Sequence, residues 1–356
     1  MREETEPAPP SCCPLAAHSL KLEASRGART IVILQDIQQA QQRLRGVTVH
    51  TPLVEAPQLR AGPVDRRRLF LKLENLQPIG AFKLRGAYNK IASLSGEERA
   101  RGVIAYSSGN HAQGVAYAAR ALHTKAVIVM PGNAPSIKLE ATAGLGAEIV
   151  KVGPSSKERQ LKAEELAAQH GYAIVPPYND EKIIAGQGTM GLEILEDLPQ
   201  VEVVLVPVGG GGMISGVAAA IKLSDPSIKV IGVEPALAAD AQASFRSGKL
   251  VQLTAEEVTR TQADGLRTQS IGELNFEHVR AYVDDIITVS EEEIHAAMAQ
   301  LAASPKTIAE PSGSVAVAGF LFHANELPKA TIHAAVISGG NIEPTMLSEL
   351  RSRNRP

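Results

Sequence analysis

The sequence predicts an α/β protein made of parallel sheets flanked by helices, and three observations lead to this prediction. After residue 102, Val/Ile-rich runs of strand length alternate with runs of helix length, which implies crossover connections between parallel strands. The composition is 44% hydrophobic, with 30 glycines and no tryptophan, as is common in α/β enzymes. The length of 356 residues exceeds one average domain, so we expect two compact units of about 150 residues each.

Two elements precede the regular alternation. The apolar spacing over residues 31–44 suits a helix, and the run Leu-Phe-Leu-Lys-Leu at residues 69–73 indicates a strand. Proline and glycine within residues 77–80 indicate a turn after this strand. A helix is therefore expected to begin near Phe82.

Segments of strand and helix character then follow one another along the chain. The expected strands are residues 103–106, 126–130, 148–152, 172–175, 201–208, 229–233, 286–289 and 333–338. The expected helices are residues 110–122, 135–143, 157–170, 184–195 and a segment that ends at residue 223. We predict a small domain over residues 102–180, inserted into a large domain formed by residues 30–101 and 181–350. Residues 1–29 are expected to form a flexible tail.

Charge and composition argue against several classes of partner. A formal net charge of -2 provides no global field that favours nucleic acid or an anionic membrane, and no apolar run reaches the roughly 18 residues that span a bilayer. The only cysteines are the neighbours Cys12 and Cys13, and adjacent cysteines rarely bridge each other. Residues 1–29 mix acids with prolines, unlike a secretory signal or a transit peptide. We therefore expect a cytoplasmic protein that binds neither nucleic acid nor membrane.

The first candidate for chemistry is Lys83, which follows Phe82 after a flexible Pro-Ile-Gly-Ala approach. A lysine that forms a Schiff base needs a mobile arm and a pKa lowered by partial burial, so that its amine can attack an aldehyde and later carry a proton. For this residue taken alone, a solvated helix lysine is the competing interpretation.

The second candidate is the run of four glycines Gly209, Gly210, Gly211 and Gly212, followed by Met213, between an apolar strand and a helix. Amides without neighbouring Cβ atoms can converge there on a phosphate, assisted by the helix dipole. No Lys-Ser/Thr pair follows, so the run is not a nucleoside-triphosphate P-loop. A plain tight turn is the alternative.

Two further polar runs also follow expected strands. Ser-Ser-Gly-Asn-His, with Ser107, Ser108, Asn110 and His111, gathers hydroxyl, amide and helix N-terminal donors that could hold an α-carboxylate or a ring oxygen. Ordinary helix capping by Ser108 or Asn110 explains the same pattern. Ser-Gly-Gly-Asn, which starts at Ser338, places one hydroxyl beside two glycines and by itself predicts only a turn.

Taken together and in this order, the four motifs resemble those of the fold-type II pyridoxal-phosphate (PLP) enzymes, which have the tryptophan synthase β-like fold. From about residue 49 to residue 341 the chain resembles the serine racemase and serine/threonine dehydratase branch. The resemblance implies that Lys83 holds PLP as a Schiff base, that Phe82 lies near the ring, and that residues 209–213 bind the phosphate.

The resemblance also assigns roles to other residues. It implies that Asn110 contacts the ring hydroxyl, that Glu310 lies near the ring, and that Ser338 faces the pyridine nitrogen. A serine at that position leaves the ring nitrogen largely unprotonated and weakens the electron sink, which suits elimination and racemisation. The segment from Ser107 to His111 is implied to bind the substrate, a small hydroxy amino acid.

Ser108 distinguishes activities within the branch. Sequences of the Ser-Ser-Gly-Asn-His type resemble racemases, in which this serine faces the lysine across the substrate plane, and racemisation needs proton donors on both faces. The leading expectation is therefore a serine racemase with accompanying serine/threonine β-elimination. The alternatives are a dedicated L-threonine/L-serine dehydratase, an enzyme that acts on 3-hydroxyaspartate, a β-replacement synthase, a non-catalytic PLP-binding protein, and a nucleotide-binding α/β protein.

A possible metal loop contains Glu234, Ala238 and Asp240 and resembles the divalent-cation loop of the same racemases. Two carboxylates and the Ala238 carbonyl would give oxygen ligands suited to Mg²⁺, Ca²⁺ or Mn²⁺, although two acids six residues apart can also be ordinary surface charges. The resemblance further implies a homodimer. Ile79 and Ala81 stand where many members have hydroxyl residues, which leaves the preferred substrate side chain open.

Overall fold

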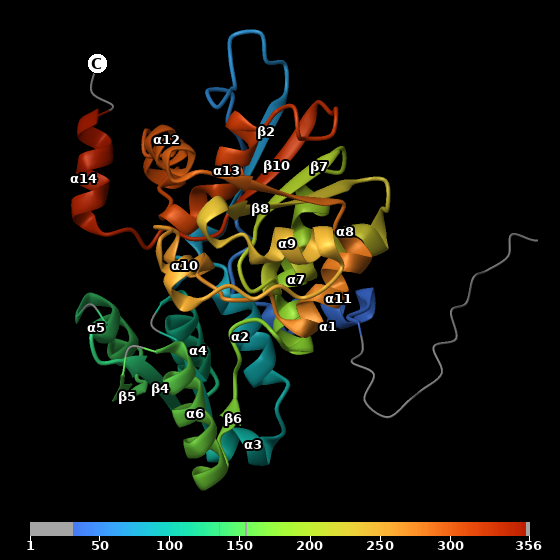
Figure 1. Ribbon diagram of the computed structural model, residues 1–356. Helices are drawn as coiled ribbons and strands as arrows, with labels where there is room; N and C mark the ends of the chain where they lie inside the picture. Colours follow the sequence, from blue (N-terminus) through green and yellow to red (C-terminus); the bar gives the residue numbers. More distant parts are fainter. Residues whose placement is uncertain (1–30, 108, 135, 154, 354–356) are drawn as a thin grey trace, which may run out of the picture. The chain divides into compact units, whose positions relative to one another are not determined.

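The computed structural model describes residues 31–353, with gaps at residues 108, 135 and 154. The expected tail, Cys12 and Cys13, and the candidate Ser108 therefore lie outside the described residues. The chain forms two separate sheets, which Figure 1 shows with their surrounding helices. The prediction of an α/β fold with parallel sheets is confirmed, whereas the proposed division into a large and a small domain remains a prediction.

The larger sheet has six strands in the order β1-β2-β10-β7-β8-β9. All neighbouring pairs are parallel except β1 and β2, which are antiparallel. The strands are β1 (Leu53–Glu55), β2 (Arg68–Leu73), β10 (Ile332–Ile337), β7 (Val203–Pro207), β8 (Lys229–Pro235) and β9 (Asp285–Val289). Strands β7 and β10 are apolar along most of their length because a parallel sheet is covered on both faces.

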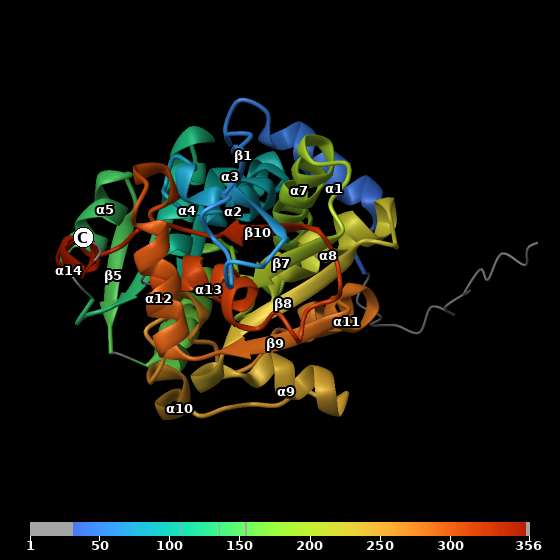
Figure 2. The ribbon, with the colours of Figure 1, turned by 90° about the horizontal axis from the view of Figure 1, so that it is seen from above.

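Strand β7 illustrates how this sheet builds two cores, since successive side chains of a strand point to opposite faces. Val203 and Leu205 pack into a core with α12 (Glu291–Leu301) and α13 (Pro311–Phe322). Val204 and Val206 pack into another with α7 (Glu181–Asp197), α8 (Gly212–Ser224) and α11 (Glu273–Tyr282). Figure 2 shows helices on both sides of the sheet.

The second sheet has four parallel strands in the order β5-β4-β3-β6. Its strands are β5 (Glu148–Val152), β4 (Ala126–Pro131), β3 (Val103–Tyr106) and β6 (Ala173–Ile174). Ala105 and Ile128 pack against α2 (Lys83–Ala92) and α4 (Asn110–Ala121), whereas Ile104 and Val127 pack against α6 (Ser156–His170). Each sheet is thus buried on both faces.

The other α-helices are α1 (Leu34–Leu44), α3 (Gly96–Arg101), α5 (Ser136–Gly144), α9 (Asp240–Ser247), α10 (Ala255–Thr259) and α14 (Pro344–Arg353). Short 3-10 helices are η1 (Glu74–Leu76), η2 (Ala236–Ala238), η3 (Asp264–Leu266) and η4 (Pro305–Thr307). In the part of the chain that the structure describes, no helix has both the length and the apolar character needed to cross a bilayer.

Most expected elements agree with the structure to within two or three residues. The helix expected over residues 184–195 begins earlier, at Glu181, because the Asp180 side chain caps it by accepting hydrogen bonds from the amides of Lys182 and Ile183. Strand β6 is only two residues long. Strand β1 and helices α3 and α9 to α14 were not predicted.

Candidate active site

The polar and glycine-rich motifs gather where strands end. Ser107 follows β3, Pro177 comes soon after β6, Gly209 follows β7 and Ser338 follows β10. Ligands of parallel α/β sheets bind beyond the carboxyl ends of the strands. The start of α2 is joined to this region, because the Phe82 amide donates to the Ser338 carbonyl oxygen at 3.0 Å.

Lys83 is the first residue of α2 and is largely buried. Its amine donates to the Pro177 carbonyl oxygen at 2.8 Å and lies 5.1 Å from the centre of the Phe82 ring. Burial lowers the pKa of the Lys83 amine to about 8, because a charged ammonium is poorly solvated there. About a tenth of the amine is therefore uncharged at pH 7, and this share can act as nucleophile or base.

The four glycines lead from β7 into the N-terminus of α8. Gly211 has φ +88°, a left-handed conformation that favours glycine, and Gly212 is the first residue of the helix. A Cβ on Gly210 would collide with the Tyr178 ring, and one on Gly209 would lie 2.9 Å from the Leu266 Cα. The glycines are therefore required by packing within the protein as well as by any approach of a phosphate.

The buried Met213 side chain and the N-terminus of α8 determine which groups of this segment could bind a phosphate. The Met213 side chain is buried in the core beneath the sheet, so only its main chain is available to a ligand. The free amides at the start of α8 and its dipole suit a phosphate. This donor set fits the phosphate group of PLP.

Asn110, Glu310 and Asn341 form a chain of hydrogen bonds beside Ser338. The Asn110 amide nitrogen donates to Glu310 Oε1 at 2.6 Å, and Asn341 donates to Asn110 Oδ1 at 2.7 Å. Burial, followed by the nearby Asp264 carboxylate, raises the pKa of Glu310 to about 8. Glu310 is therefore mainly an uncharged acid at neutral pH. Within the described residues, the contact of the Ser338 hydroxyl is a long one, 3.4 Å to the Ser312 carbonyl oxygen, which leaves the hydroxyl able to turn toward a ring nitrogen.

The Ser107 to His111 segment enters α4 through Gly109, which is the cap residue. The Asn110 side chain is bound to Glu310, which excludes the interpretation that it caps the helix. Ser107 Oγ accepts from the Gly109 amide at 3.3 Å. His111 is buried, its Nε2 lies 2.9 Å from the Val175 carbonyl oxygen, and burial together with the Lys83 charge lowers its pKa to about 3. The substrate-binding roles of these residues remain predictions.

Glu234 and Asp240 are both fully buried near one another. Glu234 accepts hydrogen bonds from the amides of Ala241 and Gln242, at 3.0 and 2.9 Å. Neither carboxylate oxygen of Asp240 has a hydrogen-bond partner within the described residues. Burial raises the pKa of Asp240 to about 7, and burial together with the Asp240 charge raises the pKa of Glu234 well above its usual value.

Two buried carboxyl groups with raised pKa values, one of which, Asp240, has both oxygens unpartnered within the described residues, suit a divalent cation, which would supply the missing positive charge. Ala238, at the end of η2, is buried nearby in the chain. Among the described residues, no group of three or more His, Cys, Asp and Glu side chains surrounds a possible metal position. The side chains therefore fit a cation only if carbonyl oxygens and water complete its shell.

The sequence did not reveal Pro177 and Tyr178, which lie between Lys83 and the glycines. The Pro177 carbonyl binds the lysine amine, and the Tyr178 ring packs on Gly210. Burial, with nearby Tyr106 and Asp240, raises the pKa of the Tyr178 hydroxyl to about 12. Their position just beyond the expected strand 172–175 is a signal that could have identified them.

Two sheets of parallel strands, a buried lysine with a lowered pKa and a glycine loop at a helix N-terminus define the fold-type II class of cofactor-dependent enzymes. The family model of the pyridoxal-phosphate dependent enzymes matches residues 44–339, and the chain belongs to this family. This confirms PLP as the expected cofactor.

The similarity to known proteins is high over nearly the whole chain. The chain is 47% identical over 321 residues to an L-threonine ammonia-lyase of Thermotoga maritima, covering 90% of this chain and 78% of that one. It is 42% identical over 310 residues to an L-threo-3-hydroxyaspartate ammonia-lyase of Saccharomyces cerevisiae, covering 86% and 93%. The structure of maize serine racemase has a TM-score of 0.85 at 35% identity, covering 91% and 98%. The predicted branch of serine racemases and threonine dehydratases is thereby confirmed.

Proposed function

We propose that this protein is a PLP-dependent ammonia-lyase that removes the β-hydroxyl group from a small hydroxy amino acid and yields a keto acid and ammonia. The observation that carries the proposal is the Lys83 amine, which donates to the Pro177 carbonyl oxygen next to Tyr178, the residue that packs on Gly210, and which has a pKa of about 8. Two ammonia-lyases are among the similar proteins. Elimination, first expected to accompany racemisation and to stand alone only in the alternative of a dedicated dehydratase, therefore becomes the leading proposal. L-Threonine, L-serine and L-threo-3-hydroxyaspartate are the candidate substrates.

The described residues provide a place for each part of the cofactor. Lys83 would hold it covalently, the amides of residues 209–212 would bind its phosphate, and Ser338 would meet the ring nitrogen. Asn110 would face the ring hydroxyl. When bound, PLP supplies an aldehyde for the substrate amine and an electron sink for the electrons released at Cα.

The residues of this chain would then move protons at defined atoms. The uncharged Lys83 amine would take the proton from the substrate Cα on the face toward α2 and would become an ammonium. The β-hydroxyl would leave as water by taking up a proton equivalent to the one held by Lys83, which returns the amine to its uncharged form. Uptake of another water molecule gives ammonia and the keto acid, so the overall reaction neither consumes nor releases water. Because Glu310 is uncharged below about pH 8, it adds no negative charge beside the ring.

A serine racemase activity is the second candidate, and the similarity to the maize structure supports it. Return of a proton to the face opposite Lys83 would give the D-enantiomer, and Ser108 is the predicted donor. Ser108 lies outside the described residues. Ser108→Ala should therefore remove D-serine formation while elimination of L-serine continues, and D-serine formation at the wild-type rate would contradict this role.

Mg²⁺ at Glu234, Asp240 and the Ala238 carbonyl is also part of the proposal, since the two carboxyl groups fit a hard cation. Ca²⁺ and Mn²⁺ are the alternatives. The homodimeric state and the cytoplasmic location remain predictions from sequence.

The proposal is tested by supplying the purified protein with PLP, Mg²⁺ and each candidate substrate in separate reactions. Keto acid, ammonia and the D-enantiomer are quantified in the same sample. We expect equal amounts of keto acid and ammonia with at least one substrate, and no product from Lys83→Ala. A wild-type protein that carries PLP yet releases no keto acid from any of the three substrates would refute elimination.

A further inference from the structure

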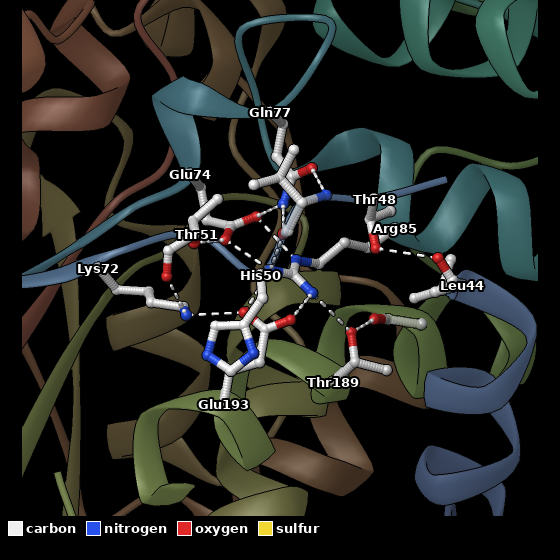
Figure 3. Close-up of polar contacts among 12 residues, drawn as sticks. Leu44, Thr48, His50, Thr51, Lys72, Glu74, Gln77, Arg85, Thr189 and Glu193 are labelled. Atoms are coloured by element: carbon white, nitrogen blue, oxygen red, sulfur yellow. Dashed lines mark hydrogen bonds and ion pairs between the residues drawn. The ribbon is translucent and has the colours of Figure 1, made fainter. Parts of the chain in front are cut away.

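A buried cluster of charged residues lies beside the first turn of α2, and its centre is Arg85 (Figure 3). The Arg85 side chain is fully buried and makes paired contacts with two carboxylates. Its Nε and Nη2 atoms donate to Glu74, both at 2.8 Å. Its Nη1 and Nη2 atoms donate to Glu193, both at 2.7 Å. The planar guanidinium is thus held from two sides.

The remaining groups of the cluster complete its hydrogen bonds. Lys72, also fully buried, places its amine 2.7 Å from Glu193 Oε2 and donates to the Thr51 carbonyl oxygen at 2.7 Å. The Thr51 hydroxyl donates to Glu74 at 2.6 Å, and Arg85 Nη1 also donates to the Thr189 hydroxyl at 3.1 Å. Two buried cations therefore face two buried anions.

Stability alone does not account for such a cluster. Removing charges from water costs several kcal/mol per ion, and well-packed apolar replacements of similar volume are often as stable. What the guanidinium adds is fixed geometry, because its N–H donors lie in one plane and can reach acceptor atoms only along fixed directions. Here those partners belong to η1 and α7, so Arg85 fixes both relative to α2.

The same turn of α2 carries Lys83, two residues before Arg85. Residues two apart on a helix point in nearly opposite directions, since each residue turns the helix by about 100°. A Cβ on Gly186 of α7 would lie 2.7 Å from the Arg85 carbonyl oxygen, and a Cβ on Gly114 of α4 would lie 3.2 Å from the Lys83 carbonyl carbon. Helices α7 and α4 therefore contact the backbone of this turn directly.

Helix α7 also connects to the other end of the Lys83 side chain. The segment just before α7 contains Pro177, whose carbonyl oxygen accepts the hydrogen bond from the Lys83 amine at 2.8 Å. The backbone of Lys83 thus lies on α2, the acceptor of its amine lies in the segment that leads into α7, and Arg85 and Glu193 join these two helices.

We propose that Arg85, held by Glu74 and Glu193, is a positioning residue for Lys83, and that it sets the point from which the lysine arm reaches the cofactor aldehyde and the substrate Cα. This inference rests on the proposed function only where it concerns the substrate Cα; the reach of the lysine to the cofactor aldehyde does not depend on it. A flexible four-carbon arm cannot correct a displaced backbone without loss of alignment, and a displacement of about 1 Å can lower a rate on the order of 100-fold.

The test compares Arg85→Lys with Arg67→Lys while the full-length protein, first freed of PLP, is reconstituted with PLP. Arg67 is a matched control, because it makes a paired contact with Asp65 at 2.9 and 2.7 Å, is 15% exposed, and lies at the opposite end of β2 from Glu74. Borohydride reduction fixes PLP to the lysine that carries it, and peptide mass analysis then gives the fraction attached to Lys83. Glu193→Gln, which keeps the shape and removes one charge, is a second variant if Arg85→Lys fails to fold.

We expect Arg85→Lys or Glu193→Gln to lower the rate of PLP attachment at Lys83 about tenfold and to shift the pH profile of attachment, while Arg67→Lys changes neither. If the folded cluster variants lose only thermal stability and attach PLP at Lys83 like the wild type across the pH range, the positioning role is refuted. PLP attachment requires no substrate. A wild type that eliminates no hydroxy amino acid would therefore contradict the proposed function without affecting this result.

Discussion

Replacing Asp240 by asparagine should stabilise the metal-free protein above pH 7 and abolish its response to Mg²⁺. In the fold, the pKa of Asp240 is raised from 3.8 to about 7, mainly by burial. A carboxyl group whose pKa is higher in the folded than in the unfolded state destabilises the fold as it ionises. The loss of stability begins near pH 4, grows as the pH rises, and is complete above about pH 7.

The size of the effect on the free energy of unfolding follows from the shift in the pKa of Asp240. About three pKa units at 1.36 kcal/mol each correspond to about 4 kcal/mol in the free energy of unfolding at pH 8. Unfolding entropy of about 2.1 cal/mol/K per residue, summed over about 320 residues, gives about 0.7 kcal/mol/K. The penalty therefore equals a change of about 6 °C in melting temperature. A cation bound by Glu234 and Asp240 should recover much of it, and protons compete with the cation at lower pH.

The assay is thermal unfolding at pH 5 and pH 8, with EDTA or with Mg²⁺, for the wild type, Asp240→Asn and Asp225→Asn. Asp225 is an exposed aspartate and serves as the control. We expect Mg²⁺ to raise the melting temperature of the wild type and of Asp225→Asn at pH 8, and to have little effect at pH 5. The reasoning is refuted if Asp240→Asn gains as much from Mg²⁺ as the wild type, or if it is no more stable than the wild type in EDTA at pH 8.

Two other substitutions test the site. Glu310→Gln mimics the uncharged acid, so it should keep most of the elimination rate at pH 7. It should also lack the decline in rate expected in the wild type as the pH rises through about 8, where Glu310 ionises. A pH profile of kcat measures both effects, and an inactive Glu310→Gln at pH 7 would show that the carboxyl group itself is needed. Gly210→Ala places a methyl group against the Tyr178 ring and should lower stability by about 1–3 kcal/mol. Gly62→Ala, which meets no atom within 4 Å, should change stability by less than about 0.5 kcal/mol. Denaturant unfolding compares the two glycine variants, and equal effects would show that packing at Gly210 is not restrictive.

Much of the fold could be predicted because its sheets are parallel and buried. The expected bounds of β3 and β5 agree with the structure, since each is a short segment rich in Val and Ile between clear helices and turns. Helix α13 was not predicted, because it is buried almost throughout and therefore lacks the alternation of polar and apolar faces that indicates a helix.

The site could be predicted in part for a related reason. Each motif follows a strand, and parallel strands bring their carboxyl ends together. Contacts between distant segments leave no such local pattern. Glu193 is 108 residues from Arg85, and nothing near either residue indicates their pairing. The sequence likewise names Met213 and His111 but does not show that both side chains point into the core.

The position of β10 bears on how the protein is assembled during synthesis. The four-stranded sheet uses residues 103–174 alone, so it can form from a continuous stretch of chain as soon as that stretch has emerged. The larger sheet cannot, because β10, its last strand in sequence, lies between β2 and β7. Such long-range pairing is slow and leaves strand edges exposed until it occurs. Since the Phe82 amide is joined to Ser338 directly after β10, the start of α2, which carries Lys83, meets this partner only when almost the entire chain has been made.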